Sequence, residues 1–117
     1  MDNVIIRDAS EKDIPIILGL LYDLGRPKPQ KDSDVETFRK LVTKYLTDSD
    51  KKILVAVLDD VKIIGMLSMI FLSRLNQNTL ETYIPELIVL ETYRTQGVGK
   101  KLISSCMTIA KEKKCHR

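Results

Sequence analysis

Apolar residues recur along the chain with two different spacings, and this predicts a mixture of strands and helices. Val4–Arg7 is a short β-rich run that predicts a first strand. Ile53–Leu58 is continuously apolar over the length of a strand, which favours burial on both of its faces. The pair Asp59-Asp60 provides turn chemistry before Val61–Leu72. These two segments are therefore predicted to form a hairpin.

Three other stretches carry apolar residues at helical spacing. The first follows Ser10–Asp13, where a capping hydroxyl precedes an acid by three residues, and Pro15 favours a start near Asp13. The second begins at Ser33 or Asp34. The third follows Gly97 and is expected to run for about sixteen residues. The three apolar stripes are Ile14, Ile17, Leu18, Leu21 and Tyr22; Val35, Phe38, Leu41, Val42, Tyr45 and Leu46; and Val98, Leu102, Cys106 and Ile109.

One more strand is expected at Thr79–Leu90, after a turn near Asn76–Asn78. Pro85 interrupts it, and because proline cannot donate to a β-ladder it marks either a bulge or an edge position. A polar loop over 25–32 separates the first two helices. The predicted order is βααβββα in an α+β (α/β) fold.

Composition narrows the classes of function. A chain of 117 residues with 44% hydrophobic and 30% charged residues suits one domain. A net charge of +3 without a basic stripe and stacking aromatics disfavours nucleic-acid binding. The longest mostly apolar run, Ile63–Leu72, is about half a membrane span. With no signal peptide apparent, the sequence predicts a cytoplasmic protein with no membrane association and no metal.

The segment with most chemical content joins the apolar run Leu87–Val89 to a glycine loop, Arg94–Lys100, that opens the last helix. A helix N-terminus has unpaired N–H groups, and glycine lets the backbone approach a phosphate closely. A dinucleotide fingerprint would need a third glycine at position 102, which is leucine. A Walker A loop would need glycine at position 94 and Ser or Thr at position 101, which are arginine and lysine. Both patterns fail on spacing.

The spacing Arg94-x-x-Gly97-x-Gly99 after an apolar strand resembles the acyl-CoA loop of the GNAT superfamily of N-acetyltransferases. The segment 5–15 resembles the opening strand and helix of that family. The resemblance implies a mixed, mostly antiparallel sheet flanked by helices, with acetyl-CoA as cosubstrate and a primary amine of a small molecule or protein as acceptor. It implies that the cosubstrate is bound by Leu87, Ile88, Val89, Arg94, Thr95, Gln96, Gly97, Val98, Gly99 and Lys100.

Within that set, the resemblance implies that the backbone of Leu87 and Val89 pairs with the pantetheine arm. The amides from Thr95 to Lys100 hold the pyrophosphate, with the Arg94 or Lys100 side chain close by. The family opens a gap between neighbouring strands beside Pro85, where acetyl-CoA enters.

Two residues are implied in catalysis. The Leu87 amide would polarise the thioester carbonyl, and Glu86 would serve as general base, with Glu81 as a weaker candidate. A surface glutamate beside a bulge, without a catalytic role, is the alternative for Glu86. His116, the single histidine, is expected to be an exposed tail residue.

The resemblance is incomplete at one end. The family continues after this helix with a further strand, helix and hairpin that carry a tyrosine general acid, and none of Tyr22, Tyr45, Tyr83 and Tyr93 fits that position. We expect a single domain, 1–117, truncated after the third helix. Its exposed sheet edge predicts either a shortened gene product or a homodimer. The alternative functions are a catalytically weak acyl-CoA-binding module and, less favoured, a nucleotide-binding fragment. The acceptor amine cannot be read from the sequence.

Overall fold

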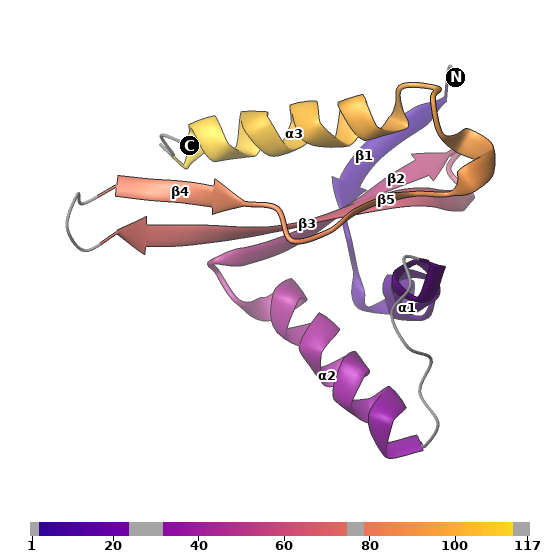
Figure 1. Cartoon of the computed structure of the whole chain (residues 1–117), viewed down its shortest axis with the longest axis horizontal. Coiled ribbons are helices and arrows are strands. Elements are labelled where there is room, and N and C mark those ends of the chain that lie inside the picture. The colour runs from indigo at the N-terminus through magenta and orange to yellow at the C-terminus, as the bar shows by residue number, and fades with distance from the viewer. Residues whose placement is uncertain (1–2, 24–31, 75–78, 114–117) are drawn as a thin grey trace.

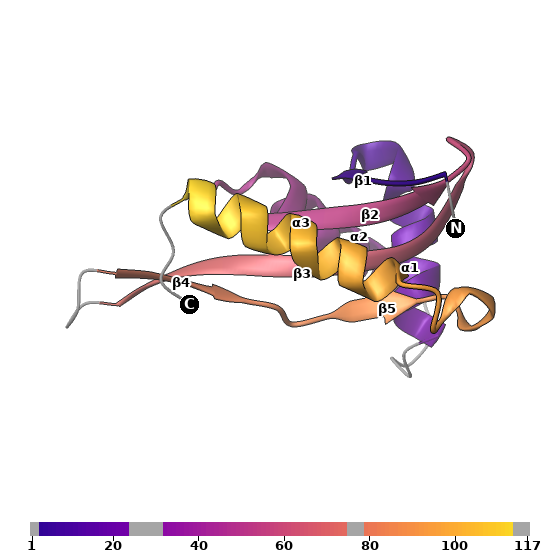
Figure 2. The same cartoon turned by 90° about the horizontal axis from the view of Figure 1, so that it is seen from above.

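The computed structural model describes residues 3–23, 32–74 and 79–113, and these form three layers with a five-stranded antiparallel sheet in the middle. Helix α3 covers one face of the sheet, while α1 and α2 lie on the other (Figures 1 and 2). The strands are β1 (Val4–Asp8), β2 (Lys51–Leu58), β3 (Lys62–Arg74), β4 (Thr79–Tyr83) and β5 (Leu87–Val89). The α-helices are α1 (Ile14–Asp23), α2 (Asp32–Thr47) and α3 (Val98–Glu112), with short 3-10 helices at Glu11–Asp13 and Glu91–Tyr93.

Most elements expected from the sequence are confirmed. The first 3-10 turn lies directly before α1, and Pro15 occupies the first turn of that helix. Helix α2 begins at Asp32, slightly before the predicted caps Ser33 and Asp34. Asp59 and Asp60 have φ of 54° and 61°, the left-handed conformation that short polar side chains tolerate in a tight turn. The expected turn at 76–78 and most of the loop at 25–32 lie outside the described residues.

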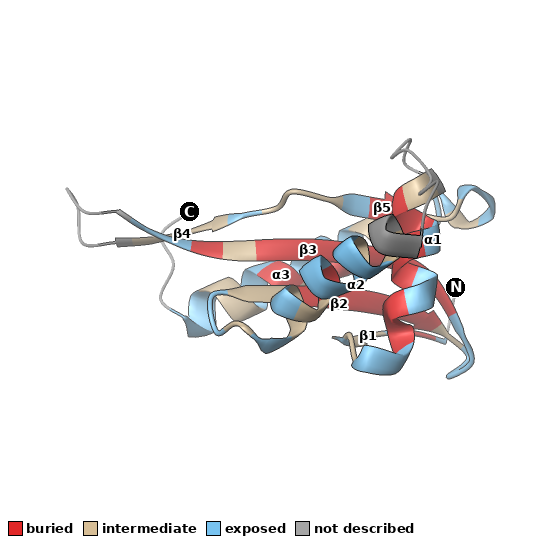
Figure 3. Cartoon of the chain, turned by 90° about the horizontal axis from the view of Figure 1, so that it is seen from below, coloured by how far each residue is buried: buried red, intermediate tan, exposed pale blue. Residues whose placement is uncertain are grey.

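The sheet separates two apolar cores. On the α1 and α2 side, Ile14 and Ile17 pack with Val55 and Met66. On the α3 side, Val98, Leu102 and Cys106 pack against the opposite face of the central strands. Residues Ile53–Val57 of β2 are all buried, as the continuous apolar run predicted (Figure 3). Both faces of the central strands are therefore covered.

The strand expected at Thr79–Leu90 is two strands on the same side of β3. Tyr83 pairs with Ile70 and Leu87 pairs with Leu67. Two residues of β3, Ser68 and Met69, lie between these pairs, whereas the opposing strand has three, Ile84–Glu86. The extra residue is a bulge, and Pro85 lies inside it because proline has no N–H for the ladder. The bulge interpretation of Pro85 is confirmed, and the predicted interruption divides the segment into β4 and β5.

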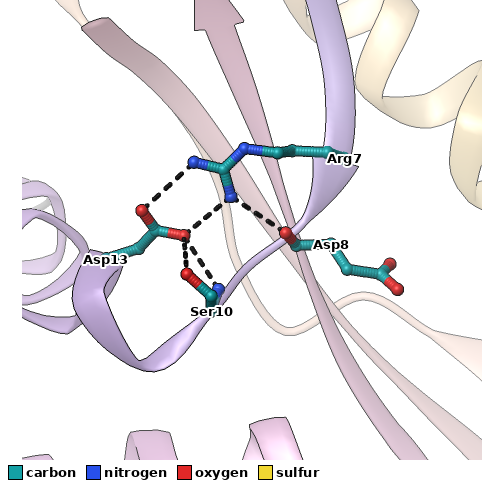
Figure 4. Close-up of polar contacts among 4 residues, drawn as sticks. All are labelled: Arg7, Asp8, Ser10 and Asp13. Atoms are coloured by element: carbon teal, nitrogen blue, oxygen red, sulfur yellow. Dashed lines mark hydrogen bonds and ion pairs between the residues drawn. The ribbon is translucent and has the colours of Figure 1, made fainter. Parts of the chain in front are cut away.

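A buried ionic cluster fixes the connection from β1 to α1 (Figure 4). The Arg7 guanidinium donates from Nη1 and Nη2 to the two oxygens of Asp13, at 2.8 and 3.2 Å. The Ser10 amide and hydroxyl also donate to Asp13 Oδ2, at 2.8 and 3.1 Å. The hydrogen bonds from Arg7, more than the opposing effect of burial, lower the pKa of Asp13 to about 2. The cluster therefore fixes the start of α1.

Candidate functional site: a sheet edge, a glycine loop and a cavity

Strand β5 has peptide groups along its outer edge that do not pair with another strand. Ser68 N–H donates to the Glu86 carbonyl at 3.0 Å, and Leu90 N–H donates to the Ile64 carbonyl at 2.8 Å. Hydrogen-bonded and non-hydrogen-bonded pairs alternate along an antiparallel ladder, so the intervening residue Ile88 also pairs with β3. The peptide groups of Leu87 and Val89 consequently point away from β3. Among the described strands, β5 pairs with β3 alone.

This geometry divides the three predicted residues of the strand. Leu87 and Val89 have backbone groups directed where an extended ligand could pair with them. Ile88 is buried, with 3% of its surface exposed, and its backbone is directed toward Met66. Ile88 therefore supports the edge from within the core.

The loop after β5 has a backbone that depends on its glycine. Gly97 has φ of 86° and precedes the first turn of α3, with nothing within 4 Å of where a Cβ would stand. Thr95 also has a positive φ, 66°, which is rare for a β-branched residue and costs free energy. Gln96 is anchored by a hydrogen bond from its side-chain amide to the Thr92 carbonyl at 3.2 Å. The loop thus holds a strained conformation at the helix entrance.

The first turn of α3 is suited to an anion. The Lys101 N–H donates to the Gly97 carbonyl at 3.1 Å and makes the first bond of the helix. The preceding amides, those of Val98, Gly99 and Lys100, have no carbonyl one turn earlier within the helix to receive them. The positive end of the helix dipole adds to their attraction for a negative group. The Val98 side chain is buried and anchors this turn, whereas Lys100 is exposed.

Arg94 turns back toward the strand. Its Nε donates to the Val89 carbonyl at 2.9 Å, so one of the outward groups of β5 already has a partner within the chain. A cavity of about 430 Å³ lies alongside, lined by β5 and the 3-10 helix that follows it. That volume is in the range of small-molecule sites. A space in which a ligand can lie is therefore bordered by the end of β5, the 3-10 helix and Arg94.

Glu86 lies on the other side of the edge. Its carboxylate oxygen Oε1 accepts a hydrogen bond of 2.5 Å from the Ser68 hydroxyl, whose Oγ in turn accepts the Glu86 N–H at 3.1 Å. Ser68 is 1% exposed. Both residues line a cavity of about 90 Å³ between the sheet and helices α1 and α2. Glu81, the weaker candidate base, lies on β4 opposite Leu72.

Two features of the site were not expected from the sequence. Ser68 is the polar residue in an otherwise apolar part of β3, and that exception was the available signal for its role. The positive φ of Thr95 had no signal, because threonine is not a residue that marks this conformation. Among the described residues, no three His, Cys, Asp or Glu side chains gather as a metal-ligand set. No helix in the described part of the chain is long and apolar enough to cross a membrane.

A strand edge, a strained glycine loop and a helix N-terminus follow one another in the order that the sequence resemblance implied. The family model of the acetyltransferase (GNAT) family matches residues 18–117. The chain belongs to this family. No curated protein matches the sequence.

Several solved structures have the same fold. A transcriptional regulator from Bacillus halodurans C-125 is 27% identical, with a TM-score of 0.85 over 97% of this chain and 78% of that one. A GNAT family acetyltransferase from Staphylococcus aureus is 23% identical, with a TM-score of 0.80 over 97% of this chain and 82% of that one. Glucosamine-6-phosphate N-acetyltransferase from Arabidopsis thaliana is 21% identical, with a TM-score of 0.82 over 98% of this chain and 79% of that one. The expected mostly antiparallel sheet flanked by helices is thus confirmed.

Proposed function

We propose that this chain is an acetyl-CoA-dependent N-acetyltransferase that acts on a primary amine. The observation that carries the proposal is the alignment of β5 with the entrance of α3. The outward peptide groups of Leu87 and Val89 lead along one edge to the unpaired amides of Val98–Lys100. A pantetheine arm would add to β5 as an extended strand, and the pyrophosphate would meet the helix N-terminus.

The acetyl group would then lie near Leu87, beside the bulge. Its carbonyl oxygen would accept a hydrogen bond from the Leu87 N–H, which stabilises the negative charge that develops during attack. The neutral amine forms a C–N bond with the carbonyl carbon, and the C–S bond breaks to release the CoA thiolate. Glu86 accepts the proton that the amine loses, and the thiolate takes a proton from water.

Arg94 has a defined part in this proposal. When acetyl-CoA enters, a pantetheine amide N–H replaces the Arg94 Nε as donor to the Val89 carbonyl. The released guanidinium then lies close to the pyrophosphate, where its charge assists binding. This is consistent with its position between β5 and the loop.

Binding of acetyl-CoA, measured by calorimetry, tests the cosubstrate. Gly97→Val should abolish binding, because a β-branched side chain disfavours φ of 86°. The control is Gly19→Ala on helix α1, where an added Cβ would also have no neighbour within 4 Å. That variant should retain the affinity. Equal affinity of Gly97→Val and the unchanged protein would place the ligand elsewhere.

Thiol release in the presence of amines tests turnover. Acetyl-CoA binding without thiol release across a broad panel of amines would favour the alternative of an acyl-CoA-binding module. A homodimer formed through a sheet edge, a cytoplasmic location and the absence of nucleic-acid, membrane and metal partners stay predictions from the sequence.

A further inference from the structure

The cavity beside Glu86 has mostly apolar walls. It is built from α1, α2 and the face of β2 and β3 that these helices cover, and its volume is about 90 Å³. Apolar side chains make up most of the lining. They include Leu21, Leu41, Val42 and Met66, with Tyr45 beside them.

Charge on the walls is limited to Glu86. Among the described residues that line this cavity there is no lysine, arginine or histidine and no second carboxylate. The Ser68 hydroxyl donates to the Glu86 carboxylate and accepts the Glu86 N–H. A carboxylate can accept about four hydrogen bonds, so Glu86 retains capacity for an amine N–H after accepting from Ser68. The cavity thus offers one acceptor for a nitrogen and apolar contacts for everything attached to it.

The volume of the cavity limits the size of the group that it can hold. A water-sized group needs roughly 10–15 Å³ on this measure of volume, so the cavity accommodates roughly six to nine such groups. Phosphorylated or richly hydroxylated amines would bring polar groups into an apolar space without partners, which is unfavourable. Polycationic amines would bring charges that a single carboxylate cannot match.

We infer that the acceptor is a primary amine that carries a compact apolar group, with the nitrogen at Glu86 and the apolar group between α1, α2 and the sheet. This inference rests on the proposed function. It distinguishes the chain from two relatives of the same fold, one named for glucosamine 6-phosphate and one crystallised with sisomicin.

The experiment measures kcat/KM by thiol release at saturating acetyl-CoA. The acceptors are the straight-chain amines from ethylamine to octylamine, phenethylamine, glucosamine 6-phosphate and sisomicin. Each buried methylene should raise kcat/KM about fourfold until the cavity is filled. Hexylamine should therefore exceed propylamine by roughly sixtyfold, and the two polar amines should react more slowly than hexylamine.

A variant pair checks that the wall causes this preference. Leu41 is 42% exposed and lines the cavity, so Leu41→Ser can remove apolar wall without opening the core. It should lower kcat/KM for hexylamine about tenfold while propylamine changes less and acetyl-CoA affinity is kept. The control is Ile16→Ser on α1. Ile16 is 47% exposed and does not line the cavity, so this variant should leave kcat/KM for hexylamine and for propylamine unchanged.

The failures of the two proposals can be told apart. Loss of the proposed function would show as no binding of acetyl-CoA, or as binding without thiol release from any amine, polar or apolar. With acetyl-CoA bound, faster turnover of glucosamine 6-phosphate or sisomicin than of hexylamine would overturn the apolar acceptor and leave the acetyltransferase in place. A flat alkylamine series, or no turnover of hexylamine and phenethylamine, would overturn it equally.

Discussion

Replacing Asp13 with asparagine should destabilise the fold at neutral pH by an amount that declines in acid. The substitution keeps the size of the side chain and an oxygen for the Ser10 amide, but it removes the negative charge beside Arg7. Asp13 has a pKa of about 2 against an ordinary value of 3.8. A depression of nearly two units corresponds to about 2 kcal/mol of stability. Because the Arg7 side chain is 36% exposed, solvent screening reduces our expectation to about 1–2 kcal/mol.

The dependence on pH follows from the direction of the shift. Since folding lowers the pKa of Asp13, its contribution is present in full above pH 3.8 and is lost as the pH falls toward 2. Roughly half of it should remain near pH 3. The measurement is urea unfolding of the unchanged protein and of Asp13→Asn at pH 7, 5, 4 and 3, with linear extrapolation to water. The difference in unfolding free energy between the two proteins should decrease from pH 5 to pH 4 and again from pH 4 to pH 3.

A matched control distinguishes the partly buried Arg7–Asp13 ion pair from an ordinary ion pair on the surface. Asp8 is the neighbouring aspartate, its side chain is 65% exposed, and it contacts Lys52 at 3.0 Å. Asp8→Asn should change the free energy of unfolding by less than about 0.5 kcal/mol. The reasoning is refuted if Asp13→Asn matches the unchanged protein, or if its deficit is the same at pH 7 and pH 3.

Three further substitutions, one of them with a control, test the sheet edge, the α3 core and the proposed general base. Gly65→Ala should cost about 1–3 kcal/mol in urea unfolding, because its Cβ would stand 3.0 Å from the Ile88 carbonyl of β5; an unchanged midpoint would contradict the close approach. Leu102→Ala, at a fully buried residue, should cost about 2–5 kcal/mol, whereas Met107→Ala, 58% exposed on the same helix, should stay within about 0.5 kcal/mol. Glu86→Gln should lower kcat about 100-fold or more if it is the general base; an unchanged kcat with an unchanged acetyl-CoA affinity would remove it from the mechanism.

The order of elements could be predicted because local chemistry and tertiary packing agree along most of the chain. Ile53–Leu58 is apolar at every position, and it is a central strand covered on both faces. The stripe of Val98, Leu102 and Cys106 repeats every fourth residue, and these side chains are buried against the sheet. The capping signal at Ser10–Asp13 correctly predicted where the first helical segment begins. The additional partner of Asp13, Arg7, comes from the preceding strand, a contact that capping chemistry does not predict.

The backbone course of the candidate site was more predictable than the directions of its side chains. The glycine spacing placed the loop, because glycine marks positions where the backbone takes a positive φ. The direction of Arg94 toward Val89 depends on where β5 ends, which the sequence does not specify. Leu41 belongs to the predicted apolar stripe of α2 and is nevertheless 42% exposed, because it borders a cavity. Helical periodicity predicts which face of a helix is apolar but not whether other side chains cover that face completely.

The single extra residue at Ile84–Glu86 explains why the two halves of the site face in different directions. If the pairing of Tyr83 with Ile70 continued without a bulge, Pro85 would stand opposite Ser68, and Glu86 opposite Leu67. A slip of one residue in a strand moves every side chain to the other face. Glu86 would then point toward α3, and the peptide groups of Leu87 and Val89 would turn inward to β3. The bulge directs the carboxylate into the cavity under α1 and α2 and turns the peptide groups of Leu87 and Val89 away from β3. The proposed base and the proposed cosubstrate edge therefore meet at neighbouring residues of one strand.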